Sequence, residues 1–146
     1  MRGWYGMAAI VAGLLVWTHA SSEAEVDLSK VLPGRWEGDV QMAAGTYPRT
    51  LIIKSIQTAS GNPVVEAEYG GKGNSYGGLE PRLAPVDVMS ESFGNDVILR
   101  FYTAEGWRVE LTLSRDQKHF YGDLRISINR AGGAWAINPV RLTKVE

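Results

Sequence analysis

Two pairs of carboxylates occupy alternate positions in the sequence and are candidates for acid and base catalysis. Glu37 with Asp39, and Glu66 with Glu68, are each two residues apart, so in a strand both members of a pair lie on one face. Two carboxylates about 5 to 10 Å apart can hydrolyse a glycosidic bond. The residues that alternate with both pairs are mostly apolar and would form the buried face. We therefore expect both pairs on a solvated outer surface rather than in a catalytic site.

Other residue types that carry catalysis or bind metals are scarce. The chain has no cysteine, and its two histidines, His19 and His119, are 100 residues apart. One histidine without cysteine forms neither a metal cluster nor a cysteine triad. We interpret His119 as a surface residue near a turn. The sequence predicts no metal, no other cofactor and no assigned catalytic residue.

Residues 70–78 contain five glycines and could bind phosphate through backbone N–H groups. The segment lacks the Gly-Lys-Ser/Thr order and the following helix of a P-loop. We interpret it as a flexible loop between strands. An alternative is that its five glycines, together with Tyr76, form a lid at the mouth of a barrel.

Alternation of polar and apolar residues predicts the elements that position these side chains. Trp36 and Val40 alternate with charged residues, and Val109 and Leu111 do the same in a second segment. No segment beyond residue 20 keeps a helical period, so any helix is short, about one turn at Asp27–Val31. Eight strands are expected, at Arg35–Met42, Arg49–Ile56, Val64–Tyr69, Leu83–Met89, Val97–Thr103, Trp107–Ser114, Phe120–Ile128 and Trp135–Val145.

Short turns between these strands predict an antiparallel up-and-down meander. Closure into a barrel would remove exposed sheet edges. Pro85 and Pro139 fall inside the fourth and eighth strands, where each lacks a backbone donor, so we expect a break, bulge or seam there. The predicted fold class is all-β, a single antiparallel β-barrel of about eight strands, closed or partly open.

The first 20 residues are typical of a signal peptide. Arg2 precedes an apolar run, Met7 to Trp17, and small residues lead to Ala20, after which we expect cleavage. An uncleaved anchor is the alternative, but the run is shorter than the roughly 18 to 20 residues that span a bilayer. We expect a signal peptide at 1–20, a linker at 21–31 and the barrel at 32–146.

Composition bounds the location and the partners of the mature chain. One of the fifteen basic residues and none of the sixteen acidic residues lies in 1–20, which leaves a net charge of about −2. Nearly balanced charge favours neither nucleic acid nor an anionic membrane as a partner. The chain is expected to be exported but has no cysteine to form disulfides. Because small secreted eukaryotic domains usually contain disulfides, this combination favours a periplasmic or secreted bacterial protein. No integral membrane span is expected after the signal.

The sequence Gly34–Gly38, with Trp36 at its centre, resembles the Gly-x-Trp signature that opens the first strand of the calycin group, which includes lipocalins and avidins. The resemblance implies that Trp36 closes one end of the barrel and that Arg141, from the last strand, lies across it. It also implies a habit of binding small molecules. The chain lacks the Thr-Asp-Tyr motif, the cysteine pair and the C-terminal helix of typical lipocalins.

The leading functional hypothesis is an exported, lipocalin-like domain that binds a small, mainly apolar molecule in or at the mouth of the barrel. Alternatives are a protein-interaction or inhibitor module with a filled core, and a cofactor-free enzyme with Tyr69 or Asp87 as acid or base. Exposed aromatics are expected as cross-strand pairs or as a platform, at Tyr47, Tyr102, Tyr121 and Trp135. The candidate ligand-binding residues are Tyr69, Tyr76, Leu99, Phe101, Val109, Leu111 and Leu124.

Overall fold

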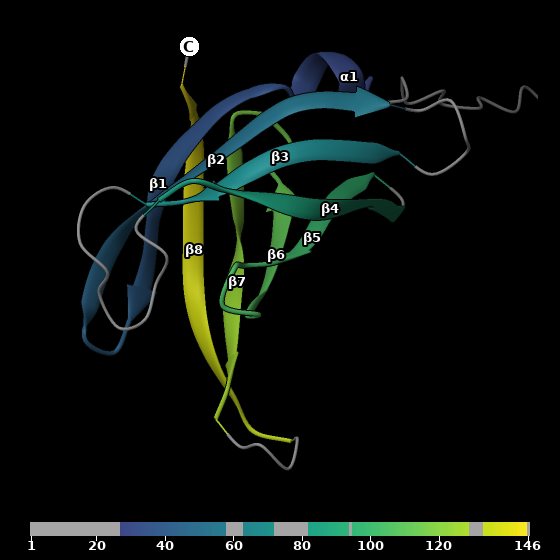
Figure 1. Ribbon diagram of the computed structural model, residues 1–146. Helices are drawn as coiled ribbons and strands as arrows, with labels where there is room; N and C mark the ends of the chain where they lie inside the picture. Colours follow the sequence, from purple (N-terminus) through teal and green to yellow (C-terminus); the bar gives the residue numbers. More distant parts are fainter. Residues whose placement is uncertain (1–26, 58–62, 72–81, 94, 129–132, 146) are drawn as a thin grey trace, which may run out of the picture.

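The protein folds as a closed barrel of eight antiparallel strands in chain order, with β8 paired back to β1 (Figure 1). The computed structural model describes residues 27–57, 63–71, 82–93, 95–128 and 133–145. The elements are α1 (Leu28–Val31), β1 (Gly34–Met42), β2 (Gly45–Gln57), β3 (Val64–Gly70), β4 (Ala84–Phe93), β5 (Asp96–Tyr102), β6 (Arg108–Leu113), β7 (His119–Ser127) and β8 (Trp135–Val145). The predicted meander is confirmed, and the barrel is closed rather than partly open.

The two prolines lie where a strand is paired on one side. β4 pairs with β3 from Ala84 to Met89, and with β5 only from Met89 onward, so Pro85 has no β5 neighbour. Pro139 lies just beyond Val140, at which the β1–β8 ladder ends. Proline has no backbone N–H to donate to a neighbouring strand. Because each proline has a neighbouring strand on one side only, no ladder hydrogen bond is lost on the other side, which explains why the sheet tolerates both prolines.

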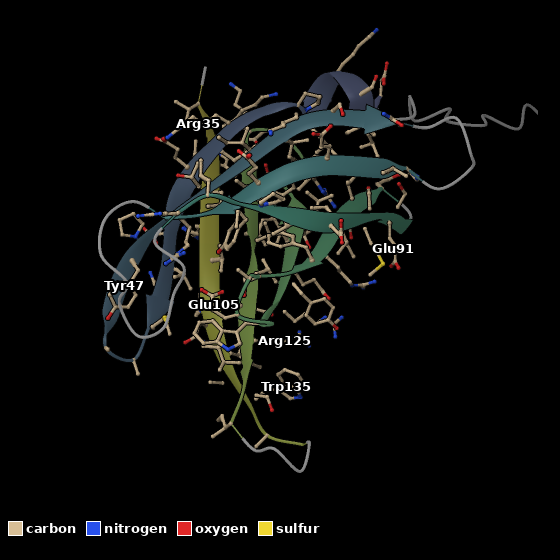
Figure 2. The ribbon with its side chains drawn as sticks, viewed as in Figure 1. Arg35, Tyr47, Glu91, Glu105, Arg125 and Trp135 are labelled. Atoms are coloured by element: carbon tan, nitrogen blue, oxygen red, sulfur yellow. The ribbon has the colours of Figure 1, made fainter. Side chains whose placement is uncertain are left out.

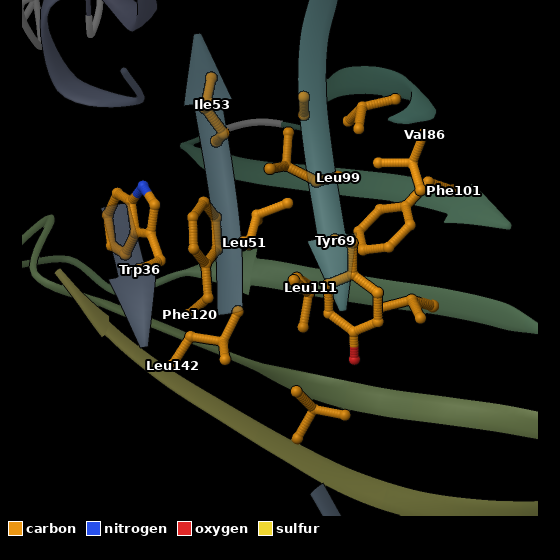
Figure 3. Packing of buried hydrophobic residues seen from close by; sticks show 14 of the residues in the cluster. Trp36, Leu51, Ile53, Tyr69, Val86, Leu99, Phe101, Leu111, Phe120 and Leu142 are labelled. Carbon is orange, nitrogen blue, oxygen red and sulfur yellow. The ribbon is translucent and has the colours of Figure 1, made fainter. Parts of the chain in front are cut away.

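Alternate side chains of every strand fill a common interior. Arg108 and Glu110 lie on the outer face, where Arg108 Nη2 is 3.1 Å from Glu110 Oε2. The two-residue period therefore separates the apolar face from the charged face as predicted. The fully buried side chains with the largest volumes are Trp36, Phe101, Phe120, Leu32, Leu51, Ile53, Leu99, Leu111, Leu124, Leu142 and Val40 (Figure 3).

Two glycines at interior positions let neighbouring strands come close. A Cβ built on Gly38 would lie 1.8 Å from the carbonyl oxygen of Arg141, and one on Gly122 would lie 1.9 Å from that of Glu110. No side chain fits at either distance. These glycines therefore permit the strong coiling of β1 and β7 that a small closed barrel requires.

One end of the barrel is closed by α1 and Trp36. Leu28 and Val31 of α1 pack against the core, and Leu32 is fully buried. The indole Nε1 of Trp36 donates a hydrogen bond of 3.0 Å to the carbonyl of Leu32. The Trp36 ring centroid lies 4.4 Å from that of Phe120. Trp36, Phe120 and Leu32 fill this end of the barrel, and we call it the closed end.

The cation over the plug is Lys144, and the prediction that Arg141 would fill this role is wrong. Lys144 Nζ lies 5.4 Å from the Trp36 ring centroid and donates a hydrogen bond of 2.6 Å to the carbonyl of Val31. Lys144 is opposite Trp36 in the β1–β8 register, so both side chains occupy the same face. Arg141 is three residues away, an odd offset, and its exposed side chain points outward.

We predict that Lys144→Met lowers the free energy of unfolding by about 1 to 3 kcal/mol, because it removes a cation-π contact and a charged hydrogen bond at the closed end. Arg141→Met is the matched control on the same strand and should change it by less than about 0.5 kcal/mol. Urea denaturation of both variants measures the difference. Equal losses in the two variants would contradict the assignment of Lys144.

Candidate functional site

The barrel interior becomes polar at the end opposite α1. The turns after β1, β5 and β7 lie there, and Figure 1 shows the β7–β8 hairpin projecting from that side. We define the polar end by the inward or buried polar residues Arg49, Tyr69, Thr103, Glu105 and Asn138. Buried polar groups are uncommon in small barrels filled by side chains, so this cluster is the candidate site.

Arg49 and Tyr69 reach the interior from β2 and β3. Leu51 is opposite Tyr69 in the register, and Arg49 is two residues before Leu51 on the same face. Arg49 is only 5% exposed and Tyr69 only 3%. A Cβ built on Gly71, just beyond β3, would lie 3.4 Å from Arg49 Cζ and from its Nη1. The Arg49 guanidinium therefore lies against the chain at Gly71, which is two residues beyond Tyr69.

Tyr69 combines an apolar ring environment with a buried hydroxyl. Its ring centroid lies 5.0 Å from that of Phe101 in an edge-to-face arrangement. Figure 3 shows the hydroxyl directed away from Phe101 and Leu99. Tyr69 Oη is buried with no hydrogen-bond partner among the described residues. Burial raises the pKa of this hydroxyl well above its usual value, Arg49 lowers it and Glu105 raises it. The group therefore remains protonated and can donate.

Glu105 lies in the tight turn between β5 and β6 (Figure 2). Thr103 N donates to the carbonyl of Trp107 at 2.8 Å, and Gly106 N donates to the carbonyl of Thr103 at 2.9 Å. Trp107 N also donates to Thr103 Oγ1 at 3.2 Å. Gly106 has a φ of +84°, a conformation that glycine adopts readily. These bonds fix the turn, and Glu105 Oε1 is buried there with no hydrogen-bond partner among the described residues.

Asn138 shows how a polar interior group is satisfied nearby. Its side-chain Nδ2 donates to the carbonyl of Leu124 at 3.2 Å. It also lies 3.4 Å from the carbonyl of Ala136. Asn138 is therefore a structural bridge between β7 and β8, in contrast to Tyr69 and Glu105, each of which has a buried oxygen without such a bond.

The structure places most of the predicted ligand-binding residues in the interior. Phe101 contacts Tyr69 directly. Tyr76 lies outside the described residues. Contact of any of these residues with a ligand stays a prediction. The buried members of the set are Tyr69, Leu99, Phe101, Val109, Leu111 and Leu124.

Two predicted placements are corrected. Asp87 is exposed on the outer face of β4, between the buried Val86 and Val88, so it is not an acid or base inside the barrel. Tyr47 is half-buried and packs against the core, because it shares the inward face of β2 with Arg49. The remaining predicted surface aromatics are exposed as expected, and these are Tyr102, Tyr121 and Trp135.

The carboxylate pairs and His119 lie outside the barrel, as predicted. Glu68 Oε1 is 3.1 Å from Lys54 Nζ, and Glu37 pairs with Arg35. His119 is exposed, with Nδ1 3.1 Å from the hydroxyl of Thr143. Within the described ranges, no three His, Cys, Asp or Glu side chains are grouped so that they could hold a metal ion.

An ion-pair network covers the outer face of β4 to β7. Arg100 Nε lies 2.9 Å from Glu110 Oε2, and Arg100 also pairs with Glu91. Arg125 Nε lies 2.8 Å from Asp123 Oδ1. The hydrogen bond from Arg100 is the main reason why the pKa of Glu110 is lowered. Surface pairs of this kind add little stability each, and their main consequence here is a hydrated outer wall.

A concave site of about 320 Å³ lies on the outer face, between β1 and β8. It is lined by Asp39, Gln41, Pro139 and Arg141. Its position follows from the end of the β1–β8 ladder at Val140, beyond which the two strands separate. The lining residues are outward-facing and partly or fully exposed, so this depression is separate from the interior cluster.

Three residues of importance were not singled out from the sequence. Arg49 and Lys144 share the inward parity of Leu51 and Leu142, so alternation alone would have placed both inside. Glu105 lies between two predicted strands, Val97–Thr103 and Trp107–Ser114, where alternation gives no direction for its side chain. No local pattern indicates that a turn residue folds back over the interior, because that depends on the tertiary contacts of the turn.

Comparison with known proteins supports the fold alone. One solved structure, described as the de novo design of a fluorescence-activating β-barrel, is similar with a TM-score of 0.51 and 15% sequence identity, covering 83% of this chain and 100% of that chain. No protein-family model and no curated protein matches the sequence. Within the described residues, no helix is long and apolar enough to cross a bilayer.

We predict that Tyr69→Phe raises the free energy of unfolding of the protein without ligand by about 1 to 2 kcal/mol, because it removes a buried hydroxyl that has no hydrogen-bond partner within the described ranges. Tyr121→Phe removes an exposed hydroxyl from the outer face and should be neutral. Thermal and urea denaturation of both variants provide the measurement. A loss of stability in Tyr69→Phe would mean that the hydroxyl is already satisfied by ordered water.

Proposed function

We propose that this protein is exported and that its barrel binds a small, mainly apolar molecule at the polar end. The observation that carries the proposal is the presence of two buried polar atoms, Tyr69 Oη and Glu105 Oε1, with no hydrogen-bond partner among the described residues. An unpaired buried polar group costs about 1 to 3 kcal/mol. A molecule that pairs with these atoms recovers that free energy, and the buried Phe101 ring, which packs against Tyr69, makes the surroundings of the hydroxyl apolar.

The fold is compatible with this proposal. Eight-stranded barrels are large enough to hold one small ligand, although side chains can also fill them. The designed barrel to which this chain is similar is described as fluorescence-activating. The Gly34–Gly38 segment and the Trp36 plug also support a lipocalin-like carrier, in which one end is sealed and the ligand enters at the other.

The export part of the proposal rests on residues 1–20, which lie outside the described residues. Their basic start, apolar run and small residues before Ser21 are typical of a cleavable signal. We expect that expression of the full chain in a Gram-negative bacterium yields a periplasmic protein that begins at Ser21. Intact mass measurement of the fractionated protein checks this. Recovery of an uncleaved chain from the cytoplasm would contradict it.

The binding proposal is tested by retention of small molecules. We expect the purified protein, incubated with a lipid-rich cell extract and desalted, to retain one small apolar molecule in a 1:1 complex that native mass spectrometry detects. Tyr69→Trp puts a larger ring beside Phe101 and should abolish retention, whereas Tyr121→Trp on the outer face should not. Circular dichroism confirms that both variants fold. An absence of retained molecules in the parent protein would overturn the proposal.

A protein-interaction role is the second candidate, and exposed apolar residues of the β7–β8 hairpin favour it. Ile128, Trp135 and Ile137 are each at least half exposed, and Figure 2 shows Trp135 toward the tip of the hairpin. Apolar groups that remain exposed together often mark interaction sites. If the interior retains nothing and affinity capture of the full chain recovers one stoichiometric protein, this function replaces the first.

A further inference from the structure

Strand β8 extends beyond the ladder that closes the barrel. β1 pairs with β8 only as far as Val140, whereas β7 pairs with β8 as far as Trp135. Within the described part of the chain, Trp135–Pro139 therefore has a strand neighbour on one side only, and we call this segment the β8 edge. The depression between β1 and β8, which Pro139 helps to line, begins at the same point. Figure 1 shows this part of the β7–β8 hairpin projecting beyond the rest of the barrel.

The register shows which backbone groups of the β8 edge point toward the side without a neighbour. Ile128 N donates to the carbonyl of Ala134 at 3.0 Å, so Ala134 and every second residue after it bond to β7. Residues between them direct their N–H and C=O groups to the opposite side of the strand. Trp135 and Ile137 therefore present two N–H and two C=O groups where β1 has ended. Pro139 is the next residue in this series and has no N–H.

The β8 edge lacks the charges that usually protect a free edge. Natural sheets keep exposed edges apart with charged side chains or prolines. The stretch of β4 that has no β5 neighbour contains both Pro85 and Asp87. In contrast, Ala134–Val140 has no charged residue, and its proline lies at the end nearer the barrel. Trp135 and Ile137 are 50% and 62% exposed, so this edge is both apolar and accessible.

Two copies of the β8 edge are complementary when they pair antiparallel about a two-fold axis at Ala136. In this register Trp135 of each copy lies opposite Ile137 of the other. The free N–H and C=O groups of both copies then form four hydrogen bonds, and none is left over. An axis at Ile137 would instead place Trp135 opposite Pro139, which cannot donate to the Trp135 carbonyl. The backbone therefore favours the axis at Ala136.

The side chains fit the same register. Trp135 and Ile137 are two residues apart and share one face of β8, so each indole covers the Ile137 side chain of the other copy. Cross-strand pairs of an aromatic and a β-branched residue stabilise sheets. On the other face, Ala136 meets its own copy at the axis, where opposed residues come closest and a small side chain is needed. No like charges meet across the axis.

We infer that the β8 edge is a docking surface for a second copy of this chain, which joins β7 and β8 of two barrels into one four-stranded sheet. This inference does not depend on ligand binding, because the barrel interior takes no part in it. The same edge is used on both copies, so the assembly closes at two chains. The interface is small, and the dimer is expected to be weak, with a Kd of about 10 to 100 μM.

The unmodified protein provides the first test. Sedimentation velocity from about 1 μM to about 1 mM should show the mass rising from one chain to two. In the concentrated sample, NMR hydrogen exchange at the Trp135 and Ile137 amides should slow severalfold, because these N–H groups become bonded only in the dimer. The Ala136 amide, which already bonds to β7, is the control in the same strand and should change less.

Variants of exposed aliphatic residues assign the association to the β8 edge. Ile137→Lys brings two like charges to the interface and should raise the dimer Kd at least about tenfold. Ile137→Pro removes an N–H that has no partner in the single barrel and should also weaken the dimer. The matched control is Val64→Lys on β3, where the parent side chain is 58% exposed, and it should leave the Kd unchanged. Circular dichroism confirms that the variants fold.

The register has its own readout. In a sample that mixes isotope-labelled and unlabelled protein, an intermolecular NOE should join the Trp135 ring of one copy to the Ile137 side chain of the other. A protein that stays monomeric at about 1 mM overturns the inference, even if the edge captures a different protein. A dimer with unchanged exchange at Trp135 and Ile137, or one that Ile137→Lys and Val64→Lys weaken equally, uses another surface and overturns it as well. The mass and exchange measurements need no variant.

Discussion

Pairing of β8 with β1 is the interaction on which the rest of the structure depends. Six residue pairs, from Arg35 opposite Val145 to Val40 opposite Val140, join the last strand to the first. This ladder closes the sheet into a barrel, and it turns one face of every strand toward a common interior. Trp36 and Lys144 are themselves opposite each other in the ladder, so the pairing that closes the sheet also places the plug and its cation.

The two ends of the interior have opposite energetic roles. At the closed end, Trp36, Phe120 and Leu32 are fully buried, and burial of each large apolar side chain stabilises the fold by about 1.5 to 3 kcal/mol. At the polar end, Tyr69 Oη and Glu105 Oε1 are buried with no hydrogen-bond partner in the described part of the chain, at a cost of about 1 to 3 kcal/mol each. The apolar end therefore supplies stability that allows the polar end to remain unsatisfied.

Two-residue alternation was sufficient to predict the strands, the barrel and the interior set, because a closed sheet converts sequence parity directly into inside and outside. The predictions for Arg141 and Asp87 were wrong because they placed on the inner face residues that this alternation puts on the outer face. Val140 and Leu142 face inward, so Lys144 does too and Arg141 does not. The same parity places Asp87 outside. The position of Glu105 could not be predicted in this way, because residues in a turn do not alternate between two faces. The conformation of its turn is fixed by backbone hydrogen bonds that involve Thr103.

The charges of the outer face and those of the interior lie in different surroundings. The outer wall carries its own paired network, in which Arg100 bridges Glu91 and Glu110, and those charges are partly hydrated and screened. Inside, Arg49 and Glu105 act on Tyr69 where burial excludes water, so each contributes more strongly than a surface charge at a similar distance.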